Sequence, residues 1–233
     1  MNNKSTRALV ILAAAGIAIC SFLFADGGPQ HKATPGEAAL SNKVLTTFAK
    51  ALPPGPDGWE KTGGTEITDL KLVFAEPNEP FEMVYFVEWQ DRKRDMEAQQ
   101  KLADALTKMD PKSLNDKTLA ELQKKLDLPD AKARIELKAN GSSFYWNSEK
   151  MNQIPSVAGG LGFRSQKQEG STYIFLGGNW KMDPRGVMFA PEKKATSSTV
   201  VQNIIVIVHA DQKRADRLIQ AIDWQALKAL IQK

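Results

Sequence analysis

The sequence is poor in the side chains that build covalent links and metal sites. It contains one cysteine, Cys20, and two histidines, His31 and His209. Because no cysteine follows Cys20, the rest of the chain can form no disulfide and no thiolate metal site. Neither histidine belongs to a metal-binding spacing such as H-x-x-x-H. We therefore predict no metal site and no cofactor, and a fold that is stabilised by packing.

The chain also lacks a strong charge of either sign. It carries 31 lysine and arginine residues against 27 aspartate and glutamate residues, and the formal net charge of +4 falls to +2 without Lys4 and Arg7. This excess is too small to indicate nucleic-acid binding, which requires a strongly basic surface. We predict no nucleic-acid partner.

One long hydrophobic run is present, and it lies at the N-terminus. Lys4 and Arg7 precede the apolar stretch Ala8–Ala25, which ends at a polar, glycine-rich turn. That order is typical of a secretory signal peptide, and its length is close to the roughly 18 residues that indicate a membrane-spanning helix. Residues 1–25 are therefore predicted to be a signal peptide or an uncleaved N-terminal membrane anchor, with membrane contact only through residues 8–25. The predicted location is the bacterial periplasm, or the inner membrane with a periplasmic domain.

The remaining chain is predicted to be a tether, residues 26–35, and a single extracytoplasmic α+β domain, residues 36–233. The strongest strand signal is Val200–Val208, whose β-branched residues fit a central strand that is covered on both faces. Strands joined by short turns are antiparallel, and helices inserted between them cover one face. We therefore predict a mostly antiparallel sheet of about eight strands with helices packed on it. The other expected strands are Thr65–Phe74, Phe81–Gln90, Ala131–Ala139, Ser142–Asn147, Phe163–Gln168, Ser171–Leu176 and Val187–Ala190.

Helix starts and tight turns are also recognisable. Thr34 and Glu37 have the spacing of a capping box, so a helix is expected to begin after Thr34 and to stop before Pro53. Asn140-Gly141 predicts a tight hairpin turn, and Asn147–Gly162 is predicted to be an irregular loop, long enough to cover a ligand. The other expected helices run from Asp91 to about Met109, over Ser113–Asp127, from Asp211 to about Ile222, and from Trp224 to about Ile231.

The sequence favours a non-catalytic protein, because no nucleophile with a base, carboxylate pair or metal cluster stands out. His209 is the candidate catalytic residue, since it follows the Val200–Val208 strand at a sheet end. A hydrolase that uses His209 with a serine or aspartate from a neighbouring loop is therefore an alternative hypothesis. A hydroxyl or carboxylate within hydrogen-bond distance of His209, in a pocket, would favour it.

Three residues are predicted to lie on a ligand or partner surface. Trp146 and Trp180 each lie beside an asparagine, which favours exposure, and exposed tryptophans are common in binding surfaces. Arg164 is the third, at the end of the glycine-rich stretch Gly159–Arg164. That stretch lacks the Gly-Lys-Ser/Thr ending of a P-loop and leads into a strand, so a phosphate cradle is not expected.

Two packing motifs lie at the ends of the domain. Leu52–Trp59 has a Leu-Pro-x-Gly-Trp-like turn with Pro-Asp-Gly inserted, and Ala221–Leu227 is part of a strand–helix ending. This pair resembles a loose group of uncharacterised exported bacterial α+β proteins, and the resemblance implies a fold and a location but no activity. We interpret the protein as an exported, non-catalytic envelope protein, a binding or structural module with a protein or lipid partner. A membrane-anchored assembly factor is a further alternative, in which residues 1–25 are retained.

Overall fold

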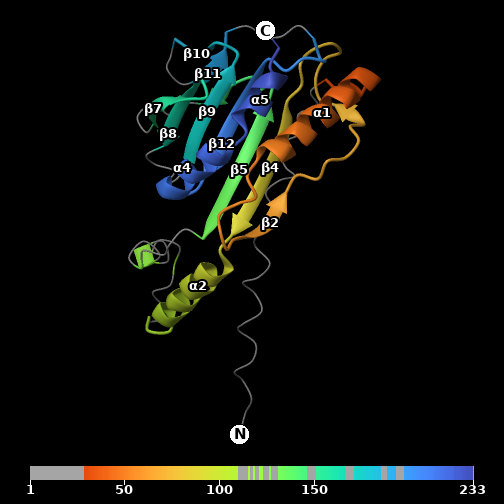
Figure 1. The fold of residues 1–233 in the computed structure, drawn as a ribbon. Coiled ribbons are helices and arrows are strands. Elements are labelled where there is room, and N and C mark those ends of the chain that lie inside the picture. The colour runs from red at the N-terminus through yellow and green to blue at the C-terminus, as the bar shows by residue number, and fades with distance from the viewer. Residues whose placement is uncertain are drawn as a thin grey trace.

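A computed structural model gives the fold and describes residues 29–109, 115, 118, 121–122, 126, 131–145, 151–165, 171–184, 188–192 and 197–232. Within these residues the protein is an α+β structure with a seven-stranded antiparallel sheet, two smaller sheets and four helices (Figure 1). The predicted class, an antiparallel sheet with helices, is confirmed, although the described residues form twelve strands rather than about eight. The predicted export segment, residues 1–25, lies outside the described residues.

The seven-stranded sheet is organised around β12, Asn203–His209. This strand is the fourth of seven, and it pairs with β5 on one side and β9 on the other. The central position predicted from the unbroken β-branched run is therefore correct. In spatial order the strands are β2 (Glu60–Gly64), β4 (Met83–Gln90), β5 (Lys132–Ala139), β12, β9 (Ser171–Gly177), β8 (Gly160–Ser165) and β7 (Met151–Val157).

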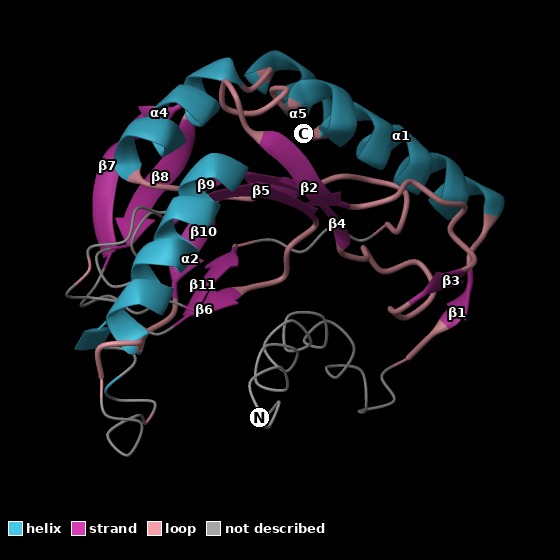
Figure 2. Ribbon diagram, turned by 90° about the horizontal axis from the view of Figure 1, so that it is seen from below, coloured by secondary structure: helices cyan, strands magenta, loops and turns pink. Residues whose placement is uncertain are grey.

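Three helices cover one face of this sheet (Figure 2). They are α1 (Pro35–Ala51), α4 (Gln212–Ala221) and α5 (Trp224–Leu230). The predicted caps of α1 and α4 are confirmed, since Thr34 and Glu37 form a capping box and the Asp211 side chain accepts from the backbone N–H of Arg214. The main core lies between these helices and the sheet. It includes Val44, Phe48, Tyr85, Trp89, Ile135, Leu137, Ile204, Val206, Leu218 and Leu227.

A small sheet lies on the other face. It consists of β10 (Trp180–Met182), β11 (Met188–Pro191) and β6 (Phe144–Tyr145), in the order β10-β11-β6. A second, aromatic core lies between the two sheets and contains Tyr173, Phe175, Trp180, Phe189, Ile205 and Ile207. The protein is thus built in three layers: helices, large sheet and small sheet.

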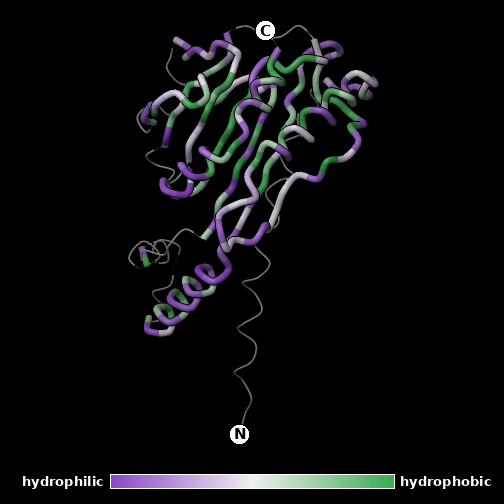
Figure 3. Tube along the Cα trace, viewed as in Figure 1, coloured by the Kyte–Doolittle hydropathy of each residue, from purple (hydrophilic) through white to green (hydrophobic). Residues whose placement is uncertain are grey.

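One helix does not join the layers. α2, Arg92–Leu106, begins at the N-cap Asp91 directly after β4 and projects away from the sheet (Figure 1). None of its residues is buried, and Figure 3 shows hydrophilic colour along much of it, in contrast to the hydrophobic central strands. The expectation that the helices pack on the sheet is therefore wrong for α2. The predicted helix Ser113–Asp127 lies mostly outside the described residues.

The strand predicted at Thr65–Phe74 is in the wrong place. β4 pairs with β2 on one side and with β5 on the other, and the only strand within the predicted range is the two-residue β3, Leu72–Val73. Leu72 and Phe74 are exposed while Val73 is buried. The two apolar residues that would face the core in the predicted strand therefore face solvent. β3 pairs with β1, His31–Lys32, which means that part of the predicted tether belongs to the fold.

Two predicted loops also differ. Asn140 does adopt a positive φ of 58°, but no hairpin follows, because both edges of β5 are already occupied by β4 and β12. Instead the Asn140 side chain donates to Val200 O and accepts from the Gln202 N–H, which fixes the chain just before β12. The irregular loop predicted at Asn147–Gly162 contains β7 and the start of β8, joined by a turn at Ala158-Gly159.

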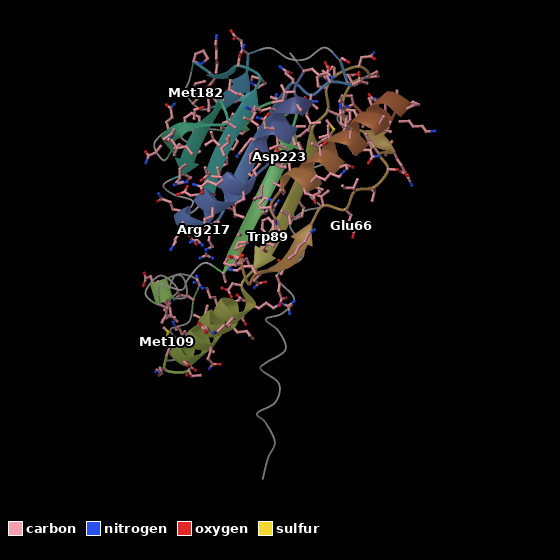
Figure 4. All side chains as sticks on the ribbon, viewed as in Figure 1. Glu66, Trp89, Met109, Met182, Arg217 and Asp223 are labelled. Carbon is pink, nitrogen blue, oxygen red and sulfur yellow. The ribbon has the colours of Figure 1, made fainter. Side chains whose placement is uncertain are left out.

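The turn after α1 packs on a core tryptophan. Trp89, labelled in Figure 4 at the end of β4, is 1% exposed, and its indole N–H donates to Pro54 O over 2.8 Å. Gly55 sits against the same ring with φ 114°, where an added Cβ would lie 2.3 Å from Trp89 Nε1. A glycine is therefore required at this position of the Leu52–Trp59 turn.

Candidate binding face

On the face of the large sheet opposite the helices, the polarity of the side chains changes from strand to strand. Neighbouring residues on β4, β5, β12 and β9 line up in three rows across this face. Each row carries a charged residue on β5 and apolar or uncharged residues on β12 and β9. The rows are Val84–Lys138–Ile205–Phe175, Phe86–Glu136–Ile207–Tyr173 and Glu88–Arg134–His209–Ser171.

Within the described residues, only part of this face is covered. The small sheet packs on the side chains of β12 and β9. On the other half, Val84 is 36% exposed and the side chain of Arg134 is 34% exposed. We call this half, with Val84, Phe86, Glu88, Arg134, Glu136 and Lys138, the β4–β5 face. An antiparallel strand with one covered face shows an apolar–polar alternation in its sequence, and Ala131–Ala139 has this pattern.

The charged side chains of the β4–β5 face hold one another in place. Arg134 Nη2 lies 2.6 Å from Glu136 Oε2, and Lys138 Nζ lies 3.1 Å from Glu136 Oε1. The guanidinium carbon of Arg134 also lies 4.3 Å from the centroid of the Phe86 ring. Glu136 is only 14% exposed at its side chain, so these contacts are less screened than those of a surface pair. The face is thus a preorganised set of charges around an aromatic ring.

His209 lies at the edge of this face, beside a serine. Its Nδ1 is 2.9 Å from Ser171 Oγ, on the paired position of β9. Burial lowers the pKa of His209, the nearby Arg134 lowers it further, and Glu136 opposes both. The imidazole is therefore neutral at pH 7 and forms a neutral hydrogen bond with Ser171.

The Ser171–His209 pair has the distance that the hydrolase hypothesis requires but not the surroundings. Ser171 is 3% exposed, and its hydroxyl also contacts Tyr173. The burial of His209 disfavours the imidazolium that would form when a histidine takes a proton from a nucleophile. A buried hydroxyl beside a histidine of lowered pKa is typical of a structural hydrogen bond.

The three predicted surface residues do not come together. Arg164 lies on the helical side of the sheet, where it forms an ion pair with Asp216 of α4 and donates from Nε to Thr172 Oγ1 over 3.1 Å. Trp180 lies on the opposite side and is 6% exposed, with ring centroids 4.9 Å from Phe175 and 5.5 Å from Phe189. The expectation of an exposed Trp180 is therefore wrong, because the aromatic core encloses it. Trp146 lies outside the described residues.

A cavity lies at another place, where β5 ends and β12 begins. Its volume is about 520 Å³, and Asn140, Gly141 and Asn203 lie in its wall. Glu79 is its one titratable lining residue, so it offers no acid–base pair. Among the described residues, no group of three or more histidine, cysteine, aspartate or glutamate side chains could hold a metal ion.

Comparisons with known proteins add no assignment: no protein-family model, curated protein or solved structure matches the chain. In the part of the chain that the structure describes, no helix combines the length and the apolar character that crossing a membrane requires. The side chains of the site are therefore the basis for any functional conclusion.

Proposed function

We propose that the protein is an exported, non-catalytic binding module of the bacterial cell envelope, and that it binds a protein partner through the β4–β5 face. The observation that carries this proposal is the fixed network of Arg134, Glu136 and Lys138 on a half of the sheet open to solvent. Side chains that are already ordered lose less entropy when a partner binds, which favours association.

The charge pattern of the face favours a protein over a lipid surface. Arg134, Glu136 and Lys138 alternate in sign along β5 at two-residue intervals, roughly 7 Å apart for an extended strand. Anionic lipid headgroups favour clusters of lysine and arginine, and here Glu136 neutralises part of the positive charge. A protein segment that presents acidic residues on either side of a basic one would complement Arg134, Glu136 and Lys138 along β5. Apolar side chains of the same segment would contact Phe86 and Val84.

Location distinguishes two forms of the proposal. If residues 1–25 are cleaved, the protein is a periplasmic binder. If they are retained, it is a membrane-anchored assembly factor whose domain faces the periplasm. The intact mass of the protein purified from its own cells separates these forms, since a chain that begins near Asp26 is cleaved.

A second candidate function, a hydrolase, is favoured by the 2.9 Å contact between Ser171 Oγ and His209 Nδ1. A fluorophosphonate probe labels activated serines, so covalent labelling of Ser171 would support the hydrolase. The burial of Ser171 leads us to expect no labelling. The Ser171→Ala variant is the matched control for any labelling that is seen.

Site-specific photo-crosslinking in living cells tests the binding proposal. A photoreactive phenylalanine analogue replaces Val84 in the β4–β5 face or, as a control, Leu72, which is 50% exposed on β3. We expect the analogue at Val84 to give one crosslinked protein, identified by mass spectrometry, and the analogue at Leu72 not to give it. The crosslink should disappear when Arg134→Glu and Lys138→Glu are added. Equal crosslinking at the two positions, or none at Val84, would contradict the proposal.

A further inference from the structure

A buried carboxylate, that of Glu37, lies near the first of the described residues. Glu37, in the first turn of α1, is 1% exposed. Its Oε2 accepts from the backbone N–H of Thr34 over 2.8 Å and from the Thr34 hydroxyl over 2.9 Å. Its Oε1 lies 3.0 Å from Nε2 of His31, and the Ser198 side chain also forms a hydrogen bond with the carboxylate. The carboxylate therefore joins three segments: residues 31–34, α1 and the loop before β12.

His31 is held from both sides of its ring. Nε2 faces the Glu37 carboxylate, and Nδ1 lies 3.0 Å from the carbonyl oxygen of Ala75, just after β3. A carboxylate and a carbonyl only accept hydrogen bonds, so both ring nitrogens need a proton. A neutral imidazole has one N–H, and its other nitrogen would then face an acceptor without a hydrogen between them. The geometry fits the imidazolium form alone.

Residues 29–32 have few other contacts among the described residues, whereas Ala33 packs against the main core and Thr34 caps α1. β1 has two residues, His31 and Lys32, and pairs only with the equally short β3. The next hydrogen bond runs from the Ala33 N–H to Lys71 O over 3.0 Å. Two-stranded pieces of this size are marginal in water, so the side chain of His31 decides whether the segment stays on the domain.

We propose that His31 and Glu37 form a protonation-dependent latch, which holds the segment before α1 against β3 while His31 is charged and releases it when His31 loses its proton. Release would free residues 29–32, an extended length of roughly 13 Å. The latch would therefore set how closely the domain is held to whatever precedes residue 29, a membrane anchor or a new N-terminus. It acts in either case and does not depend on the partner proposed for the β4–β5 face.

The charged groups around His31 favour the closed form. Among the described residues, α1 contributes Glu37 and the segment after β3 contributes Glu76, both acidic. The hydrogen bond to Glu37 is the main cause that raises the pKa of His31, the bond to Ala75 O adds to it, and burial opposes it. A pKa above the ordinary value of 6.5 means that the latch is closed below that value and opens as pH rises through the pKa in the folded protein.

The test follows His31 protonation and segment protection in the same full-length protein, in detergent micelles. His209→Gln leaves His31 as the only histidine, so its imidazole ¹⁵N signals are unambiguous. Hydrogen exchange of the peptides that cover residues 31–36 is measured over the same pH range and corrected for intrinsic exchange. The variants are His31→Gln, which removes the latch, and Lys32→Gln, a matched control on the same strand. Peptides from α1 report whether each variant remains folded.

We expect both nitrogens of His31 to be protonated at pH 6 and its titration to lie above pH 6.5. Protection of Ala33 should fall, as pH rises through that titration, to the level of His31→Gln, and Lys32→Gln should follow the wild type. Glu37→Gln should lower the pKa of His31. The proposal is overturned if His31 is neutral at pH 6. It is also overturned if protection of Ala33 in His31→Gln equals that of the wild type, or stays constant while His31 titrates.

Discussion

Glu37→Gln is expected to lower the free energy of unfolding by about 3 kcal/mol at pH 7. Burial alone would raise the pKa of Glu37, but hydrogen bonds from Thr34, His31 and Ser198 outweigh it and hold the pKa at about 2, against an ordinary value of 4.5. Each tenfold change in proton affinity is worth about 1.4 kcal/mol, so this difference stabilises the folded, ionised protein by about 3 kcal/mol. The glutamine keeps the size of the side chain but removes the charge.

The stabilisation by the Glu37 carboxylate depends on pH. The pKa is lower in the folded protein, so the stabilisation is complete above pH 4.5 and is lost as pH falls toward 2. About 1.4 kcal/mol should remain at pH 3. Urea denaturation of wild type and variant at both pH values, followed by tryptophan fluorescence, measures the two differences.

The control is Glu60→Gln. Glu60 is 56% exposed and pairs with Arg92 at the surface, so its loss should change stability by less than about 1 kcal/mol at either pH. A Glu37→Gln difference below about 1 kcal/mol at pH 7, or one that is equal at pH 7 and pH 3, would refute the role assigned to the buried carboxylate.

Two further predictions concern packing. Gly55→Ala should destabilise the protein by more than Gly58→Ala, because both glycines have a positive φ but only Gly55 lies against Trp89, and the added Cβ would break the indole bond to Pro54 O. Equal losses in urea denaturation would show that the contact with Trp89 is unimportant. Trp180→Ala should cost about 3–5 kcal/mol, since a buried ring is removed from the aromatic core. A Trp180→Ala variant with wild-type stability and a lost partner would instead return Trp180 to the binding surface.

The elements that were predicted correctly have signals that lie within one stretch of sequence. β12 follows from its unbroken β-branched run, and α1 and α4 follow from their caps and apolar stripes. β2 was missed because Gly63 and Gly64 have low strand propensity, and they pair only because β4 offers a free edge. Asn140-Gly141 was misread because a hairpin also needs an unoccupied strand edge, which no local pattern reveals.

Only part of the candidate site can be predicted from the sequence. The alternation in β5 does indicate that Arg134, Glu136 and Lys138 share one face. Their contact with Phe86, and the contact of His209 with Ser171, depend on the register of strands that are distant in the chain. The same is true of Trp180, whose neighbour Asn179 suggested exposure, whereas the packing of the small sheet buries it.

The most direct test of the binding role is native mass spectrometry of two proteins purified in mild detergent from the envelope of their own cells. One is the wild type, and the other carries Arg134→Glu and Lys138→Glu in the β4–β5 face. We expect the wild type to appear as a complex with one defined protein subunit, and the double variant to appear alone, with an unchanged hydrogen-exchange pattern in α1 and β12. A wild type that carries no subunit, or a double variant that keeps it, would contradict the proposed function.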